Sequence, residues 1–135
     1  MIHGNPNVSP DLSRQAFLSS RSGAASRMVV SNPPFFTYCL PQVPISGSNF
    51  SMNLLFKDEK LTEIRLCLQP NRNNPTWNNW SEAEELTMKK EHENFLLSQL
   101  GPGNAGVCSY SYNWGNIDSV YSEIEGASEI IVKYK

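Results

Sequence analysis

The most constraining feature of this chain is a pair of segments, 50–56 and 64–68, in which apolar and polar residues alternate. The apolar positions are Phe50, Met52, Leu54, Phe56, Ile64, Leu66 and Leu68. Because successive side chains of a β-strand point to opposite faces, this period predicts two half-buried strands. The short polar segment between them predicts an antiparallel hairpin. A hairpin that is apolar on one face needs a second layer to cover that face, which restricts the fold class.

The register of this hairpin follows because facing residues must share one side of the sheet. The predicted pairs are Phe50 with Leu68, Met52 with Leu66, Leu54 with Ile64, and Phe56 with Thr62. This register leaves residues 58–60 as a three-residue loop, which is a common hairpin connection. The other face carries mostly polar side chains, so we expect it to be wet or lightly covered.

The secondary structure before the hairpin is predicted from residues that typically begin or end helices and strands. Residues 1–34 are rich in Ser, Asn, Arg, Gly and Pro and form a predicted leader, partly flexible. Within it, a serine N-cap followed by proline predicts a short helix over 9–19. A strand over 35–40 follows. We expect Pro41 and Pro44 to end it, because proline cannot donate to a β-ladder.

The second half of the chain predicts one long helix and further strands. The capping box at 81–84 starts the helix, and the glycines at 101–103 stop it. Alternation returns at 110–114, and Gly115 is predicted to hold a bulge that shifts the phase. A closing strand is predicted at 130–134.

Together these elements predict an α+β fold with two layers. It would consist of an antiparallel sheet of four to five strands with the long helix on one face and a short N-terminal helix, in the order α-β-β-β-α-β-β. A chain of 135 residues is long enough for one core. Residues 35–135 would therefore form a single domain behind the leader.

Composition argues against several function classes. The formal charge of −2 and the pI of about 5.6 argue against nucleic-acid binding. The chain has two histidines and three cysteines without metal-ligand spacing, so we predict no metal and no cofactor. The odd number of cysteines, the absence of a signal sequence and the absence of a long apolar run predict a cytoplasmic protein that does not enter a membrane.

The candidate ligand-binding residues are aromatic or ionisable. They are Trp77, Trp80, His92, Glu93, Tyr110, Tyr112 and Trp114. A shared aromatic cluster that closes the core is one interpretation, and a groove for a small molecule or a peptide is the other. No nucleophile, base and orienting group can be assembled from the sequence, so we predict no catalytic residue and no enzyme activity.

The candidate interface residues are Leu55, Arg65, Cys67 and Ile131, which are predicted to point away from the long helix. They predict a protein that binds another protein or forms a homodimer. A third hypothesis uses Arg14, Arg21 and Arg27 with the aromatic strand to bind nucleic acid, and the acidic chain argues against it.

Three sequence segments carry a resemblance to known proteins. They are F-x-x-x-x-L-x-x-I-x-L in the hairpin, W-S-E-A-E-E-L at 80–86, and W-G-N-I-D-S-V-Y at 114–121. Together they resemble a loose group of small bacterial proteins encoded on mobile gene cassettes or beside toxin genes. The resemblance implies a bacterial accessory protein with an immunity-type or partner-binding role, and it implies no catalytic residue. A small-molecule-binding domain or minor enzyme that uses the aromatic residues is the alternative.

Overall fold

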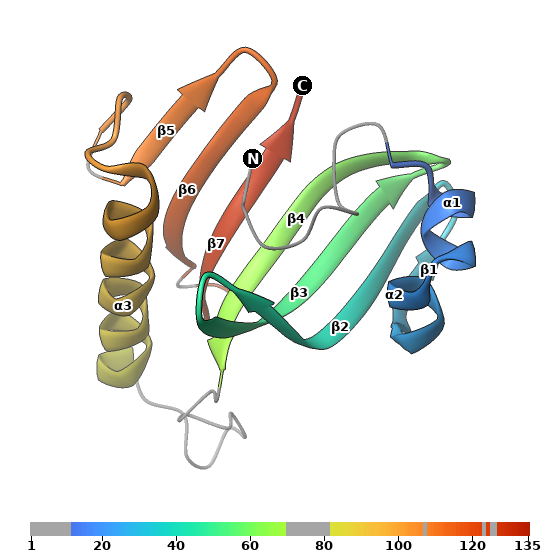
Figure 1. The fold of residues 1–135 in the computed structure, drawn as a ribbon, viewed down its shortest axis with the longest axis horizontal. Helices are drawn as coiled ribbons and strands as arrows, with labels where there is room; N and C mark the ends of the chain where they lie inside the picture. Colours follow the sequence, from blue (N-terminus) through green and yellow to red (C-terminus); the bar gives the residue numbers. More distant parts are fainter. Residues whose placement is uncertain (1–11, 70–81, 107, 123, 125–126) are drawn as a thin grey trace.

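The computed structural model describes residues 12–69, 82–106, 108–122, 124 and 127–135. Its elements are α1 (Arg14–Ser19), α2 (Arg21–Ala25), β1 (Arg27–Asn32), β2 (Phe35–Ile45), β3 (Ser48–Lys57), β4 (Lys60–Gln69), α3 (Glu82–Leu100), β5 (Ser109–Tyr112), β6 (Gly115–Ser122) and β7 (Ala127–Tyr134). Among the described residues, seven strands form one antiparallel sheet in the order β1-β2-β3-β4-β7-β6-β5 (Figure 1). The predicted sheet of four to five strands and the predicted element order are therefore wrong.

The hairpin of β3 and β4 has the predicted register over most of its length. Phe50 faces Leu68, Met52 faces Leu66, and Leu54 faces Ile64. Nearer the turn a β-bulge shifts the register, so Phe56 faces Leu61 instead of Thr62. The connection is therefore the two residues between Lys57 and Lys60, not the predicted loop of three. The bulge turns Leu61 to the apolar face, where it is fully buried beside Phe56.

Strand β2 continues beyond Pro41 and Pro44, where the sequence predicted its end. A register shift between Leu40 and Val43 takes two residues out of the β2–β3 ladder. In addition, the β1 ladder reaches only Cys39, so the later part of β2 is itself an edge on that side. Proline is tolerated there because no neighbouring strand needs its missing N–H.

Two helices and a strand come from the segment that the sequence treated as a leader. Helix α1 begins after Ser13, whose Oγ accepts a hydrogen bond from the Ala16 N–H at 3.0 Å. The start signal predicted at 9–11 lies outside the described residues. Phe17 anchors α1 to the sheet, because its ring packs against Tyr38 and Phe56 with centroids 5.6 and 5.8 Å away. Strand β1 then pairs with β2 and forms one edge of the sheet.

Helix α3 packs against β4, β6 and β7 at the other end of the sheet (Figure 1). Its buried residues are Glu85, Met88, His92, Phe95 and Leu96. The Phe95 ring meets Phe50 edge-on, with a centroid distance of 4.8 Å. Gly101 ends the helix with a φ of 74°, and its N–H donates to the Leu97 carbonyl. The predicted capping box includes Ser81, which lies outside the described residues.

Gly115 begins a new strand, and the predicted bulge at this position is wrong. Strands β5 and β6 form a hairpin in which Tyr112 faces Gly115. Gly115 has a φ of 155°, and a Cβ added to it would lie 1.9 Å from the Lys133 carbonyl oxygen of β7. The close approach of the two strands therefore requires glycine at this position.

Both α1 and α3 lie on the same side of the sheet, because Phe17 and Phe95 contact residues of its apolar face. We call this side the helix face. The opposite side, which we call the open face, carries Leu55, Arg65, Cys67 and Ile131 in adjacent ladder positions. Neither α1 nor α3 packs against the open face.

Candidate functional site

The described aromatic candidates fall into two separate roles. Tyr110 is buried, and its hydroxyl donates a hydrogen bond to the Gly101 carbonyl at 2.6 Å. Tyr112 and Trp114 stack with centroids 5.2 Å apart, and Trp114 also meets Tyr134 at 5.6 Å. These last three rings are half-buried and pack against the core. Trp77 and Trp80 lie outside the described residues.

His92 and Glu93 contact other parts of the protein. The His92 side chain is fully buried, and its Nε2 accepts a hydrogen bond from the Leu68 backbone N–H at 3.1 Å. Burial lowers the pKa of His92 to about 4, so the imidazole is neutral at physiological pH. Glu93 is half-buried and forms an ion pair with Lys89 one helical turn away. The hydrogen bond of the His92 imidazole therefore connects the end of β4 to α3.

The described residues contain neither a metal-ligand cluster nor a membrane-spanning helix. In that part of the chain, no group of three or more His, Cys, Asp and Glu side chains is placed to hold a metal ion. No helix there is both long and apolar enough to cross a bilayer.

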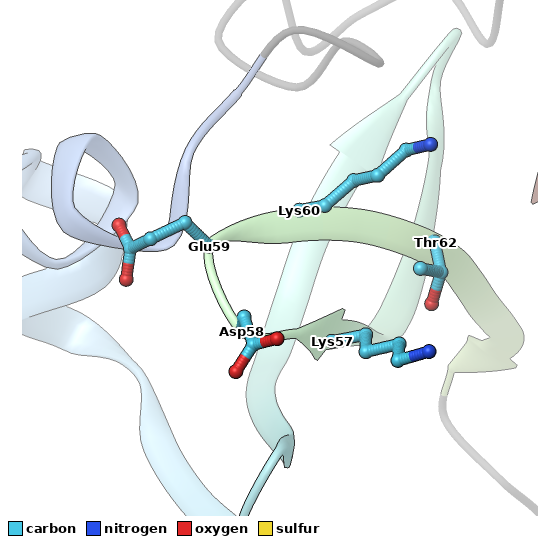
Figure 2. Close-up of a pocket in the computed structure, with 5 residues that line it drawn as sticks. All are labelled: Lys57, Asp58, Glu59, Lys60 and Thr62. Atoms are coloured by element: carbon cyan, nitrogen blue, oxygen red, sulfur yellow. The ribbon is translucent and has the colours of Figure 1, made fainter.

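A pocket of about 560 Å³ lies at the turn between β3 and β4 (Figure 2). Its lining residues are Lys57, Asp58, Glu59, Lys60 and Thr62. All of them except Thr62 are exposed, and the two lysines are balanced by the two carboxylates. None of these five side chains is a hydrophobic or an aromatic one, whereas such side chains predominate in typical small-molecule sites.

The four predicted interface residues share the open face and are all half-buried. Asn53, Arg65 and Ile131 occupy one row across β3, β4 and β7. The Arg65 guanidinium pairs with Glu63 on its own strand and with Glu129 on β7 at 3.6 Å. The centre of the open face is therefore a network of ion pairs around Arg65, with Leu55 and Ile131 beside it.

Cys67 is also on the open face, next to this network. Burial is the main cause that raises its pKa to about 12, and the carboxylates of Glu85 and Glu129 raise it further. The thiol is therefore protonated at neutral pH, and a protonated thiol is a weak nucleophile.

The β1 edge is a candidate site that the sequence prediction missed. All six residues of β1 are exposed, including Met28 at 53%, Val29 at 48% and Val30 at 45%. Phe35, at the start of β2, is 53% exposed and faces Asn32 of β1. No described strand pairs with the outer side of β1. The run Met28-Val29-Val30 before Asn32-Pro33-Pro34 was the available signal, because β-branched residues followed by a break indicate a strand.

Comparisons with family models, with curated proteins and with solved structures give no match to this chain. The bacterial origin and the mobile-cassette context therefore stay predictions.

Proposed function

We propose that this protein is a non-enzymatic interaction domain that binds a partner protein by adding an extended segment of that partner to β1. The observation that carries the proposal is the exposed aliphatic edge formed by Met28, Val29 and Val30. A sheet edge offers unpaired backbone N–H and C=O groups, and an extended peptide can satisfy them as an additional strand. The exposed apolar side chains would supply contact area on either side of the new strand.

The two edges of the sheet differ in ways that favour β1. Strand β5 at the opposite edge is four residues long and has the sequence Ser-Tyr-Ser-Tyr. Strand β1 has six residues, three of them aliphatic, and it carries no lysine, a residue that commonly protects exposed edges. A bulge at Val29 and the prolines after Asn32 limit the pairing to a short segment. These limits suit a short peptide better than a long strand.

The open face remains a second surface for protein binding or for a homodimer. Its candidates Leu55, Arg65, Cys67 and Ile131 are half-buried, and Arg65 already has carboxylate partners there. Binding at this surface would desolvate these ion pairs, which costs free energy, so we rank this surface below β1. The aromatic site around His92 ranks lower still, because the imidazole Nε2 is already used by Leu68.

The proposal is tested by selecting peptides from a random library on the immobilised protein and measuring their affinity for two variants. Val30→Glu places a negative charge on the β1 edge and removes apolar contact area. Leu97→Glu is the matched control, since Leu97 on α3 is 44% exposed against 45% for Val30. We expect Val30→Glu to abolish binding and Leu97→Glu to preserve it. Equal affinity of the selected peptides for both variants would refute the proposal.

A further inference from the structure

The segment bound at β1 can be characterised further from charge, and this inference rests on the proposed function. We infer that it is an acidic peptide segment that carries both carboxylate and apolar side chains. Charge is unevenly distributed along the chain: of the 13 acidic residues, only Asp11 precedes residue 57. Between residues 12 and 56 the only charged side chains are Arg14, Arg21 and Arg27.

The sheet topology turns this separation along the sequence into a separation in space. Residues 12–56 build α1, α2, β1, β2 and nearly all of β3, which lie together at one end of the sheet (Figure 1). Strand β4, helix α3 and strands β5 to β7 form the other end and contain eight of the 13 carboxylates, whereas Asp58 and Glu59 lie in the turn between β3 and β4. Arg14 forms an ion pair with Glu59 at 3.7 Å, whereas Arg27 lies on β1 itself and is exposed. A positive charge on an exposed apolar edge favours an acidic partner, because opposite charges attract and like charges repel across an interface.

Individual positions on β1 define the pattern that the added segment would need. Arg27 faces Cys39, which faces Asn53, so the arginine lies on the open-face side of the sheet. Met28 faces Tyr38 and therefore lies on the helix-face side. The bulge at Val29 places Val30, which faces Thr37, on the same side of the sheet as Arg27. A carboxylate of the added segment would therefore lie beside Arg27, and apolar side chains would lie beside Met28 and Val30.

Two other occupants fit the β1 edge less well. A second copy paired through the same edge would bring two arginine-bearing ends together without any carboxylate on β1 or β2 to offset them. A single-stranded nucleic acid would need several aromatic platforms for its bases, whereas β1 offers Met28, Val29 and Val30, with the single exposed ring of Phe35 beside it. The acidic, partly apolar segment satisfies both the charge and the side-chain chemistry.

The test measures the binding of three short labelled probes by fluorescence anisotropy at low and high salt. The first peptide alternates Glu with Val, the second alternates Lys with Val, and the third probe is a single-stranded thymidine oligonucleotide. We expect the Glu peptide to bind about tenfold more tightly than the Lys peptide, and salt to reduce this difference. Tighter binding of the Lys peptide or of the oligonucleotide would overturn the inference.

Two variants and one exchange measurement separate this inference from the proposed function. Arg27→Gln should weaken the Glu peptide about threefold, as expected for one exposed charge pair. Lys133→Gln removes a positive charge on β7 and should leave the affinity unchanged. If both peptides slow amide exchange in β1 with equal affinity, the proposed function survives and the acidic preference is wrong. If neither peptide slows amide exchange in β1, the proposed function and the acidic preference are both wrong.

Discussion

His92 on α3 accepts the backbone N–H of Leu68 at the end of β4 through Nε2, at 3.1 Å. This bond requires a neutral imidazole, because a protonated Nε2 has no lone pair to accept it. The other ring nitrogen, Nδ1, is buried and has no hydrogen-bond partner among the described residues. The histidine therefore joins the helix to the sheet only while it is uncharged.

Stability should consequently fall in mild acid. Burial lowers the pKa of His92 from 6.5 to about 4, so the unfolded chain takes up the proton at a higher pH than the folded one. The free energy of unfolding should decrease between about pH 6.5 and pH 4, by at most about 1.4 kcal/mol per pH unit for this group. Urea unfolding at a series of pH values measures this slope.

The contribution of His92 is isolated with two variants. His92→Gln keeps an oxygen that can accept the Leu68 N–H but does not titrate, so the slope should become shallower at little cost near pH 7. His92→Leu removes the acceptor and should cost about 1–3 kcal/mol at pH 7, because the Leu68 N–H loses its partner. A wild-type slope in both variants would show that other groups cause the pH dependence.

A second polar contact joins α3 to the sheet and should also be important for stability. The Glu85 carboxylate accepts the Ser128 N–H at 3.1 Å, and the Glu85 backbone carbonyl accepts the Ser128 hydroxyl. Both residues are buried. Ser128→Ala should therefore lower the free energy of unfolding by about 1–2 kcal/mol, while Ser98→Ala on the exposed side of α3 should change it by less than about 0.5 kcal/mol. Equal losses in chemical denaturation would contradict this account.

Gly115 should be far less tolerant of alanine than Gly47. Both have positive φ, but an added Cβ at Gly115 would lie 1.9 Å from the Lys133 carbonyl oxygen, and one at Gly47 would have nothing within 4 Å. We expect Gly115→Ala to cost about 2–4 kcal/mol and Gly47→Ala about 1 kcal/mol. Thermal unfolding compares the two. Similar costs would mean that β6 can move away from β7.

Cys67 should react slowly with alkylating reagents. Its pKa of about 12 leaves very little thiolate at pH 8. In a chain carrying Cys39→Ser and Cys108→Ser, iodoacetamide should modify Cys67 more than about a hundredfold more slowly than free cysteine. Mass spectrometry over time gives the rate, and modification at the rate of free cysteine would contradict the protonated state.

The sequence predicted the centre of the fold better than its margins. The hairpin of β3 and β4 was predictable because one face is buried, so a slip of one residue would move every apolar side chain to the open face. The bulge beside Thr62 was not predictable, because it depends on Leu61 reaching the core. The alternation of apolar and polar residues relates only positions that are two apart along one strand.

Strand β1 was missed for a different reason. All of its residues are exposed, so no alternation between buried and exposed positions marks it. The extension of β2 through its prolines depends on where β1 stops, which is a property of the assembled sheet. The open-face residues were predicted only from the alternation of side chains along each strand, and they do share one face of the sheet. Whether they form an interface stays a prediction.

The central claim is that β1 binds an extended segment, and amide hydrogen exchange of the peptide complex tests it most directly. Exchange is measured with and without the peptide that alternates Glu and Val. Added backbone hydrogen bonds at the edge should slow exchange at residues 27–32, while β5 at the opposite edge stays unchanged. A bound peptide that slows exchange elsewhere and leaves residues 27–32 unprotected would contradict the claim.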